Sequence, residues 1–141
     1  MAERPPPPPW GALLTSALRS AGLSAREGAR RAGISEGRWR QIASGYQVVS
    51  PGVYAPVHGP AQTVARMAAV AGVSPAQLTG AGRPDAATAL ASRHADASHE
   101  LMLQRVREMS PEQARELLAA IAVQLGIRVA ADRAGECRYG T

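Results

Sequence analysis

The stretch of sequence that decides the fold reads Leu23-Ser-Ala-Arg-Glu-Gly-Ala-Arg-Arg-Ala-Gly-Ile-Ser-Glu-Gly-Arg-Trp-Arg-Gln-Ile-Ala-Ser-Gly45. Its segment Ser24-Ala-Arg-Glu27 has the form of a capping box, in which the serine hydroxyl and the glutamate carboxylate each satisfy a free backbone N–H. A helix therefore begins there and runs to about Ala32. Gly33 predicts a turn, and a second helix follows from Ser35 to Ser44.

Two helices joined by a glycine turn pack at a steep angle, which requires a small residue where they cross and a turn residue that accepts a positive φ. Ala29 and Gly33 meet these two requirements. The apolar residues Trp39 and Ile42 are spaced to anchor the second helix on the first part of the chain. The outward face of the second helix then consists of Glu36, Gly37, Arg40, Gln41 and Ser44.

Three further helices surround this pair. Apolar residues recur with helical spacing from Leu13 to Ala21, and Gly22 predicts the end of that helix. Pro60 suits the first turn of a helix that ends at Gly72. Ser74-Pro-Ala-Gln77 is a second capping box and opens a short helix through Leu78. The sequence thus predicts five helices in an all-α fold.

The segment between Gly45 and Gly59 interrupts the helices. Pro51 and Pro56 exclude a helix here, and we expect an ordered loop. The turn-forming residues Ser50-Pro51-Gly52 lie between Val48-Val49 and Val53-Tyr54, which suggests a short hairpin.

This arrangement resembles the lambda-repressor-like helix-turn-helix family, of the xenobiotic-response-element type. The resemblance is carried by an alanine, a glycine, an aliphatic residue and a serine at positions 29, 33, 34 and 35, by the apolar residue at 42 and by the closing glycine at 45. It also covers the order of the five helices over residues 10–82. It implies a dimeric, sequence-specific DNA-binding transcriptional regulator, most simply a repressor, that binds double-stranded DNA.

The same resemblance implies which side chains meet DNA. Arg40 suits the O6 and N7 atoms of guanine, and Gln41 suits N6 and N7 of adenine, because both pairings are bidentate. The residues implied to read base edges are Ser35, Glu36, Gly37, Arg40 and Gln41. The residues implied to hold phosphates are Ser24, Arg26, Arg30, Arg31, Arg38 and Ser44.

The distribution of charge agrees with a phosphate partner. The chain contains no Lys and no Asn, which indicates a GC-rich bacterial genome, so its many arginines partly replace lysine. Its high isoelectric point alone is therefore weak evidence for binding to nucleic acid. Residues 10–46, however, carry six arginines and two glutamates, whereas residues 85–141 carry seven arginines and eight acids. Positive charge is concentrated around the proposed recognition helix, as phosphate binding requires.

The remaining segments are expected to be peripheral. Residues 1–9 contain five consecutive prolines and are interpreted as a disordered tail, with a ligand for a proline-recognising module as the alternative. Residues 83–126 form a helical extension, in which residues 91–100 are either a linker or an exposed helix. The capping box Ser110-Pro-Glu-Gln113 opens its last helix. Residues 127–141 are interpreted as a flexible tail.

The last helix carries an apolar stripe. It is interpreted either as a dimer contact or as a surface that packs on the chain's own domain. Its residues are Leu117, Leu118, Ile121 and Leu125.

The sequence contains few residues that would support metal binding, catalysis or membrane insertion. The single Cys137 cannot form an internal disulfide, and the histidines lack the spacing of a metal site, so we expect no metal, no cofactor and no catalysis. With no apolar run of membrane-spanning length and no signal peptide, a cytoplasmic location is expected. The alternative function is a protein-interaction module, an antitoxin or adaptor, whose C-terminal helices bind a protein partner.

Overall fold

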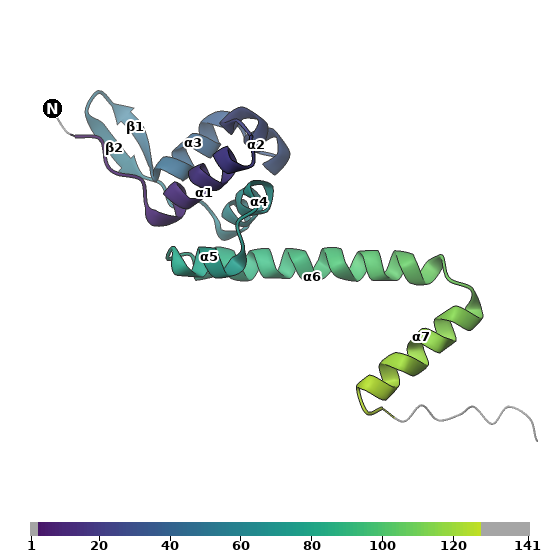
Figure 1. The fold of residues 1–141 in the computed structure, drawn as a ribbon. Coiled ribbons are helices and arrows are strands. Elements are labelled where there is room, and N and C mark those ends of the chain that lie inside the picture. The colour runs from purple at the N-terminus through teal and green to yellow at the C-terminus, as the bar shows by residue number, and fades with distance from the viewer. Residues whose placement is uncertain (1–2, 128–141) are drawn as a thin grey trace, which may run out of the picture. The chain divides into compact units, whose positions relative to one another are not determined.

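The computed structural model describes residues 3–127 and is mainly helical (Figure 1). The chain divides into two compact units, Met1–Ala97 and Ser98–Thr141. In chain order the elements are α1 (Pro9–Ser20), α2 (Ala25–Ala32), α3 (Glu36–Ser44), β1 (Tyr46–Ser50), β2 (Val53–Pro56), α4 (Ala61–Ala71), α5 (Pro75–Gly80), α6 (Pro84–Arg107) and α7 (Pro111–Gln124).

The boundaries of α2 and α3 follow from their capping residues. Ser24 Oγ accepts a hydrogen bond from the Glu27 N–H at 3.2 Å, and Ser35 Oγ accepts one from the Arg38 N–H at 3.1 Å. Gly33 joins the helices with a φ of 70°, a left-handed conformation that favours glycine. The predicted capping box at Ser24 is only half formed, because the Glu27 carboxylate bonds to two arginines rather than to the Ser24 amide.

A single apolar core holds the first unit together. Trp39 and Ile42 anchor α3 in this core, as the sequence predicts, and both are almost fully buried. At the crossing of α1 and α3 a Cβ on Gly11 would overlap the carbonyl oxygen of Ala43, so only glycine permits this close approach. The other large buried side chains come from α1, α4, α5 and α6: Leu14, Met67, Leu78, Leu90 and Val64.

An antiparallel hairpin follows α3, as the Ser50-Pro51-Gly52 turn suggests, where the main expectation is an ordered loop. Strands β1 and β2 pair from Tyr46 opposite Pro56 to Ser50 opposite Val53, with an irregularity before Ser50. The rings of Tyr46 and Tyr54 meet edge to face, with their centroids 5.1 Å apart. The turn between the two strands uses Gly52 at a φ of 75°. The expectation of an all-α fold is therefore corrected to a mainly-α fold with one small sheet.

The first unit does not end at the predicted boundary of residue 82. The first turns of α6 belong to its core, since Ala86 and Leu90 are fully buried there. Residues 91–100 form an exposed helix, which is one of the two predicted alternatives.

Arg83 is buried just before α6 and fixes this junction. It donates to the Asp85 carboxylate and to the backbone carbonyls of His58 and Gly59, at 2.6 to 3.0 Å. Its guanidinium also lies over the Trp10 ring, 4.9 Å from the ring centroid. One side chain thus joins α6 to α1 and to the loop before α4.

The second unit contains the end of α6 and all of α7. The predicted capping box at Ser110 is complete, because both the Gln113 N–H and the Gln113 side chain bond to Ser110. Leu118, Ile121 and Leu125 are exposed, while Leu117 is half-buried. The flexible tail predicted from residue 127 and the lone Cys137 lie outside the described residues, apart from Ile127.

Helix α1 begins earlier than the sequence predicts, inside the run of prolines. Pro9, assigned to the extended proline tail, is the first residue of α1, and Pro8 caps that helix in an extended conformation. Among the described helices, none combines the length and the apolar character that crossing a membrane demands.

Candidate nucleic-acid interface

The outer face of α3 carries the candidate base-reading side chains. Gly37 and Arg40 are exposed, while Glu36 and Gln41 are half-buried. Arg40 does not project freely, because its Nη2 donates to Glu36 Oε1 at 2.5 Å across one helical turn. The structure thus brings four of the five predicted base-reading residues to one helix face, with Ser35 at its N-terminal cap.

Gly37 has no structural partner within the described chain. A Cβ built at this position meets no heavy atom within 4 Å, and the backbone there is regular helix. Nothing in the protein's own packing therefore requires glycine at this exposed position, which leaves room for the backbone to approach a ligand.

The candidate phosphate-binding arginines fall into two groups. Arg30 and Arg31 both bond to the Glu27 carboxylate, at distances of 2.6 to 3.0 Å. Hydrogen bonds from these arginines lower the pKa of Glu27 to about 2, so this group is ionised at neutral pH. Within residues 3–127, by contrast, Arg26 and Arg38 make no ion pair. Arg26 and Arg38 are thus the readier partners for an external anion.

The predicted serine ligands also differ in chemistry. Ser24 and Ser35 accept a hydrogen bond from a backbone N–H, so each hydroxyl proton remains available to a phosphate oxygen. The Ser44 hydroxyl instead donates toward the carbonyls of Gln41 and Tyr46, at 3.2 and 3.1 Å. Ser44 therefore has to break an internal hydrogen bond before it can donate to a phosphate.

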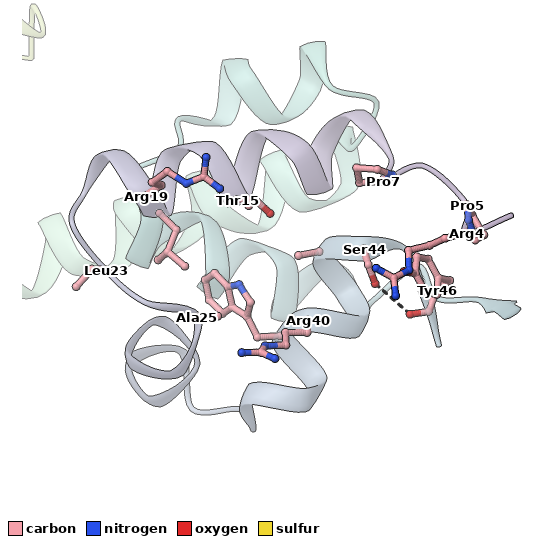
Figure 2. A pocket seen from close by; sticks show the side chains of 13 residues that line it. Arg4, Pro5, Pro7, Thr15, Arg19, Leu23, Ala25, Arg40, Ser44 and Tyr46 are labelled. Atoms are coloured by element: carbon pink, nitrogen blue, oxygen red, sulfur yellow. Dashed lines mark hydrogen bonds between the residues drawn. The ribbon is translucent and has the colours of Figure 1, made fainter. Parts of the chain in front are cut away.

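A groove of about 480 Å³ runs between α1, the start of α2 and α3. We call it the α1–α3 groove; Leu18, Trp39 and Ala43 line it from the core side. In Figure 2, Arg19 lies at one end beside Leu23 and Ala25, and Arg4 lies at the other. A second depression, the α3–β1 hollow, is lined by Arg4, Arg40, Gln41, Ser44, Tyr46, Gln47 and Val48.

Both depressions are cationic. In the part of the chain that the structure describes, no acidic residue lines either of them. Arg4 and Arg19 were missing from the predicted site, because Arg4 lies in the proline tail and Arg19 in the preceding helix, both outside the stretch from Leu23 to Gly45. For Arg19, helical spacing from Leu18 could have signalled its exposed position on α1.

A metal site requires several ligating side chains close together in space. Between residues 3 and 127, no three histidine, cysteine or acidic side chains gather in a way that could hold a metal ion. The α3 face carries the paired charges of Glu36 and Arg40 together with the amide of Gln41 and the flanking cation Arg38, and this excess of positive charge suits an anionic partner.

Comparison with known proteins returns no match to any family model, curated protein or solved structure. The likeness to the helix-turn-helix family therefore rests on the residues between Leu23 and Gly45 and on the order of the helices.

Proposed function

We propose that the chain is a sequence-specific DNA-binding regulator with a five-helix, lambda-repressor-like domain, in which α3 enters the major groove. The observation that carries this proposal is the two-sided character of α3. Its inner face is fixed by the buried Trp39 and Ile42, while its outer face presents polar side chains and is flanked by Arg38, which makes no ion pair within residues 3–127. A rigid helix with one polar face is what major-groove recognition uses.

Base recognition is assigned to the middle of α3. Arg40 makes a bidentate contact with guanine after it exchanges its hydrogen bond with Glu36 for the base edge. This exchange costs little, because an exposed pair four residues apart on a helix contributes only about 0.3–0.5 kcal/mol. Gln41 is adjacent and suits adenine.

Phosphate binding sets the register of α3 on the duplex. Arg26 at the start of α2 and Arg38 in α3 supply positive charge that no acidic side chain in the described chain neutralises. The Ser24 and Ser35 hydroxyls add neutral donors.

The test is a titration of labelled duplex with the full chain at several salt concentrations. Binding through several arginines has to weaken steeply with salt, because bound counterions compete for the phosphates. Arg40→Ala is expected to weaken binding to the preferred sequence by about 1–3 kcal/mol and to leave binding to random duplex nearly unchanged. Absence of duplex binding at low salt contradicts the proposal.

A dimer completes the proposed function. The second unit exposes large apolar side chains that a monomer would leave in water: Leu101, Met102, Leu118, Val123, Leu125 and Ile127. We assign the predicted stripe, Leu117, Leu118, Ile121 and Leu125, to a contact with a second copy, which would place two α3 helices on half-sites about one helical turn of DNA apart.

The same exposed residues favour the second candidate, a protein-interaction module. In that case the second unit binds a different protein through apolar contacts, and salt affects the affinity weakly. The oligomeric state separates the two candidates. A monomer that fails to bind duplex favours the interaction module.

A further inference from the structure

The five prolines at the N-terminus have no role in the function proposed so far. Each proline ring fixes φ near −65° and removes a backbone donor, so this segment is extended and stiff. It carries one positive charge, Arg4, at the end that leads away from α1. We call residues 5–8 the proline strap.

Contacts with α1 and the end of α3 fix the position of the strap. The Pro8 carbonyl accepts a hydrogen bond from the Ala12 N–H at 3.0 Å, which joins the strap to the first turn of α1. A Cβ on Gly45 would lie 2.6 Å from Pro8 Cδ, so the glycine that ends α3 allows the strap to pass. Pro5 and Pro7 continue along the α1–α3 groove near Tyr46.

This path brings Arg4 to the side of α3 that carries Arg40 and Ser44. Arg4 lines the α1–α3 groove and the α3–β1 hollow, and it shares both with Arg40 and Ser44 (Figure 2). The neighbouring Glu3 makes no ion pair within the described residues. Arg4 is thus an exposed guanidinium that makes no ion pair within the described residues, so it is available to an external anion.

We propose that the proline strap is a rigid arm that holds Arg4 beside the C-terminal half of α3, where Arg4 binds a phosphate of the DNA backbone. This inference rests on the proposed function. A phosphate is the fitting anion, because base reading is assigned to Arg40 and Gln41 in the middle of α3, whereas Arg4 lies beside Ser44, the last residue of the helix and itself a predicted phosphate ligand (Figure 2). The stiff prolines lower the entropic cost of holding Arg4 in place.

The test compares Arg4→Gln with Arg93→Gln, a control that removes an exposed arginine of α6 outside both depressions. Binding of the full chain is measured against the preferred duplex and a random duplex over a range of salt concentrations. Arg4→Gln is expected to weaken binding to both duplexes by the same factor and to reduce the slope of log K against log salt by about 0.9, the value for one phosphate contact. Arg93→Gln leaves the slope unchanged.

A second variant tests the stiffness of the strap. Replacing Pro5, Pro6 and Pro7 by glycine keeps Arg4 but frees its position, so binding weakens and the added effect of Arg4→Gln becomes smaller.

Equal slopes for Arg4→Gln and Arg93→Gln, in a chain that binds duplex, overturn the phosphate contact and leave the proposed function standing. An effect of Arg4→Gln on the preferred duplex alone overturns the phosphate assignment in favour of a base contact. If the glycine variant matches the wild type in affinity and in the effect of Arg4→Gln, the arm is not rigid.

Discussion

Gly37 offers the clearest separation of function from stability at the scale of single residues. Since no atom of the described chain lies near a Cβ at this position, Gly37→Ala is expected to raise the free energy of unfolding by about 0.5–1 kcal/mol, the usual gain of alanine over glycine in a helix. If the Gly37 backbone approaches a base pair, the same methyl group weakens specific binding. Urea unfolding and duplex titration measure the two effects. Higher stability with unchanged affinity would show that DNA does not approach Gly37.

The two groups of arginines allow a matched comparison. Arg38→Gln removes a cation without an ion pair in the described chain, while Arg30→Gln removes one that already bonds to Glu27 at 2.6 Å. Both changes are on exposed helical residues and remove one charge. We expect Arg38→Gln to reduce the salt slope of duplex binding by about 0.9 and Arg30→Gln to reduce it less. Equal reductions would mean that the Glu27 pair opens freely when DNA binds.

At the scale of elements, Arg83 is the residue on which the junction between α1, the loop before α4 and α6 depends. Arg83→Met removes hydrogen bonds to the His58 and Gly59 carbonyls as well as the pair with Asp85. Hydrogen bonds from charged donors contribute more than neutral ones, so the free energy of unfolding should fall by about 2–4 kcal/mol. Arg83→Lys keeps the charge but not the planar fork, and should recover only part of the loss.

The pH dependence of stability provides a second measurement of the same junction. The Arg83 guanidinium holds the pKa of Asp85 at about 2, below its ordinary value of 3.8. The contribution of the pair is therefore complete above about pH 3.8 and is lost as the pH falls through about 2. In Arg83→Met this part of the acid dependence should be absent. An unchanged unfolding midpoint in Arg83→Met at pH 7 would contradict the role given to this residue.

The elements differ in how well local sequence predicts them. Helices α2 and α3 follow from the hydroxyl caps at Ser24 and Ser35 and from glycines that accept a positive φ, all of which are local signals. The hairpin is harder to predict, because Val48, Val49 and Val53 are exposed and give no alternation of apolar and polar residues.

Two features could not be predicted because they depend on contacts between distant residues. Gly80, Gly82 and Pro84 resemble a linker in sequence, yet Arg83 between them is buried by partners about twenty-five residues away. The position of Arg4 likewise depends on the fit of Pro8 against Gly45. The α3 face could be predicted from its helical period, whereas the contribution of the N-terminus to it could not.

At the scale of the whole molecule, the exposed apolar side chains of α7 and of its C-cap residue Leu125 lead to an expectation about assembly. Leu118 and Leu125 are each about two-thirds exposed, and burying them against a second copy would remove apolar surface from water. The double variant Leu118→Glu with Leu125→Glu is expected to shift sedimentation from dimer to monomer and to weaken binding to a two-half-site duplex far more than binding to one half-site. A wild-type chain that sediments as a monomer at micromolar concentration would contradict the dimer.

The most direct test of the central claim is selection of bound duplexes from a randomised pool, carried out with the wild type and with Arg40→Ala. The account predicts an enriched, two-fold symmetric sequence for the wild type, and loss of preference at one guanine in each half-site for Arg40→Ala. No enrichment with the wild type, or an identical enriched sequence with Arg40→Ala, would contradict the assignment of α3 as the helix that reads DNA.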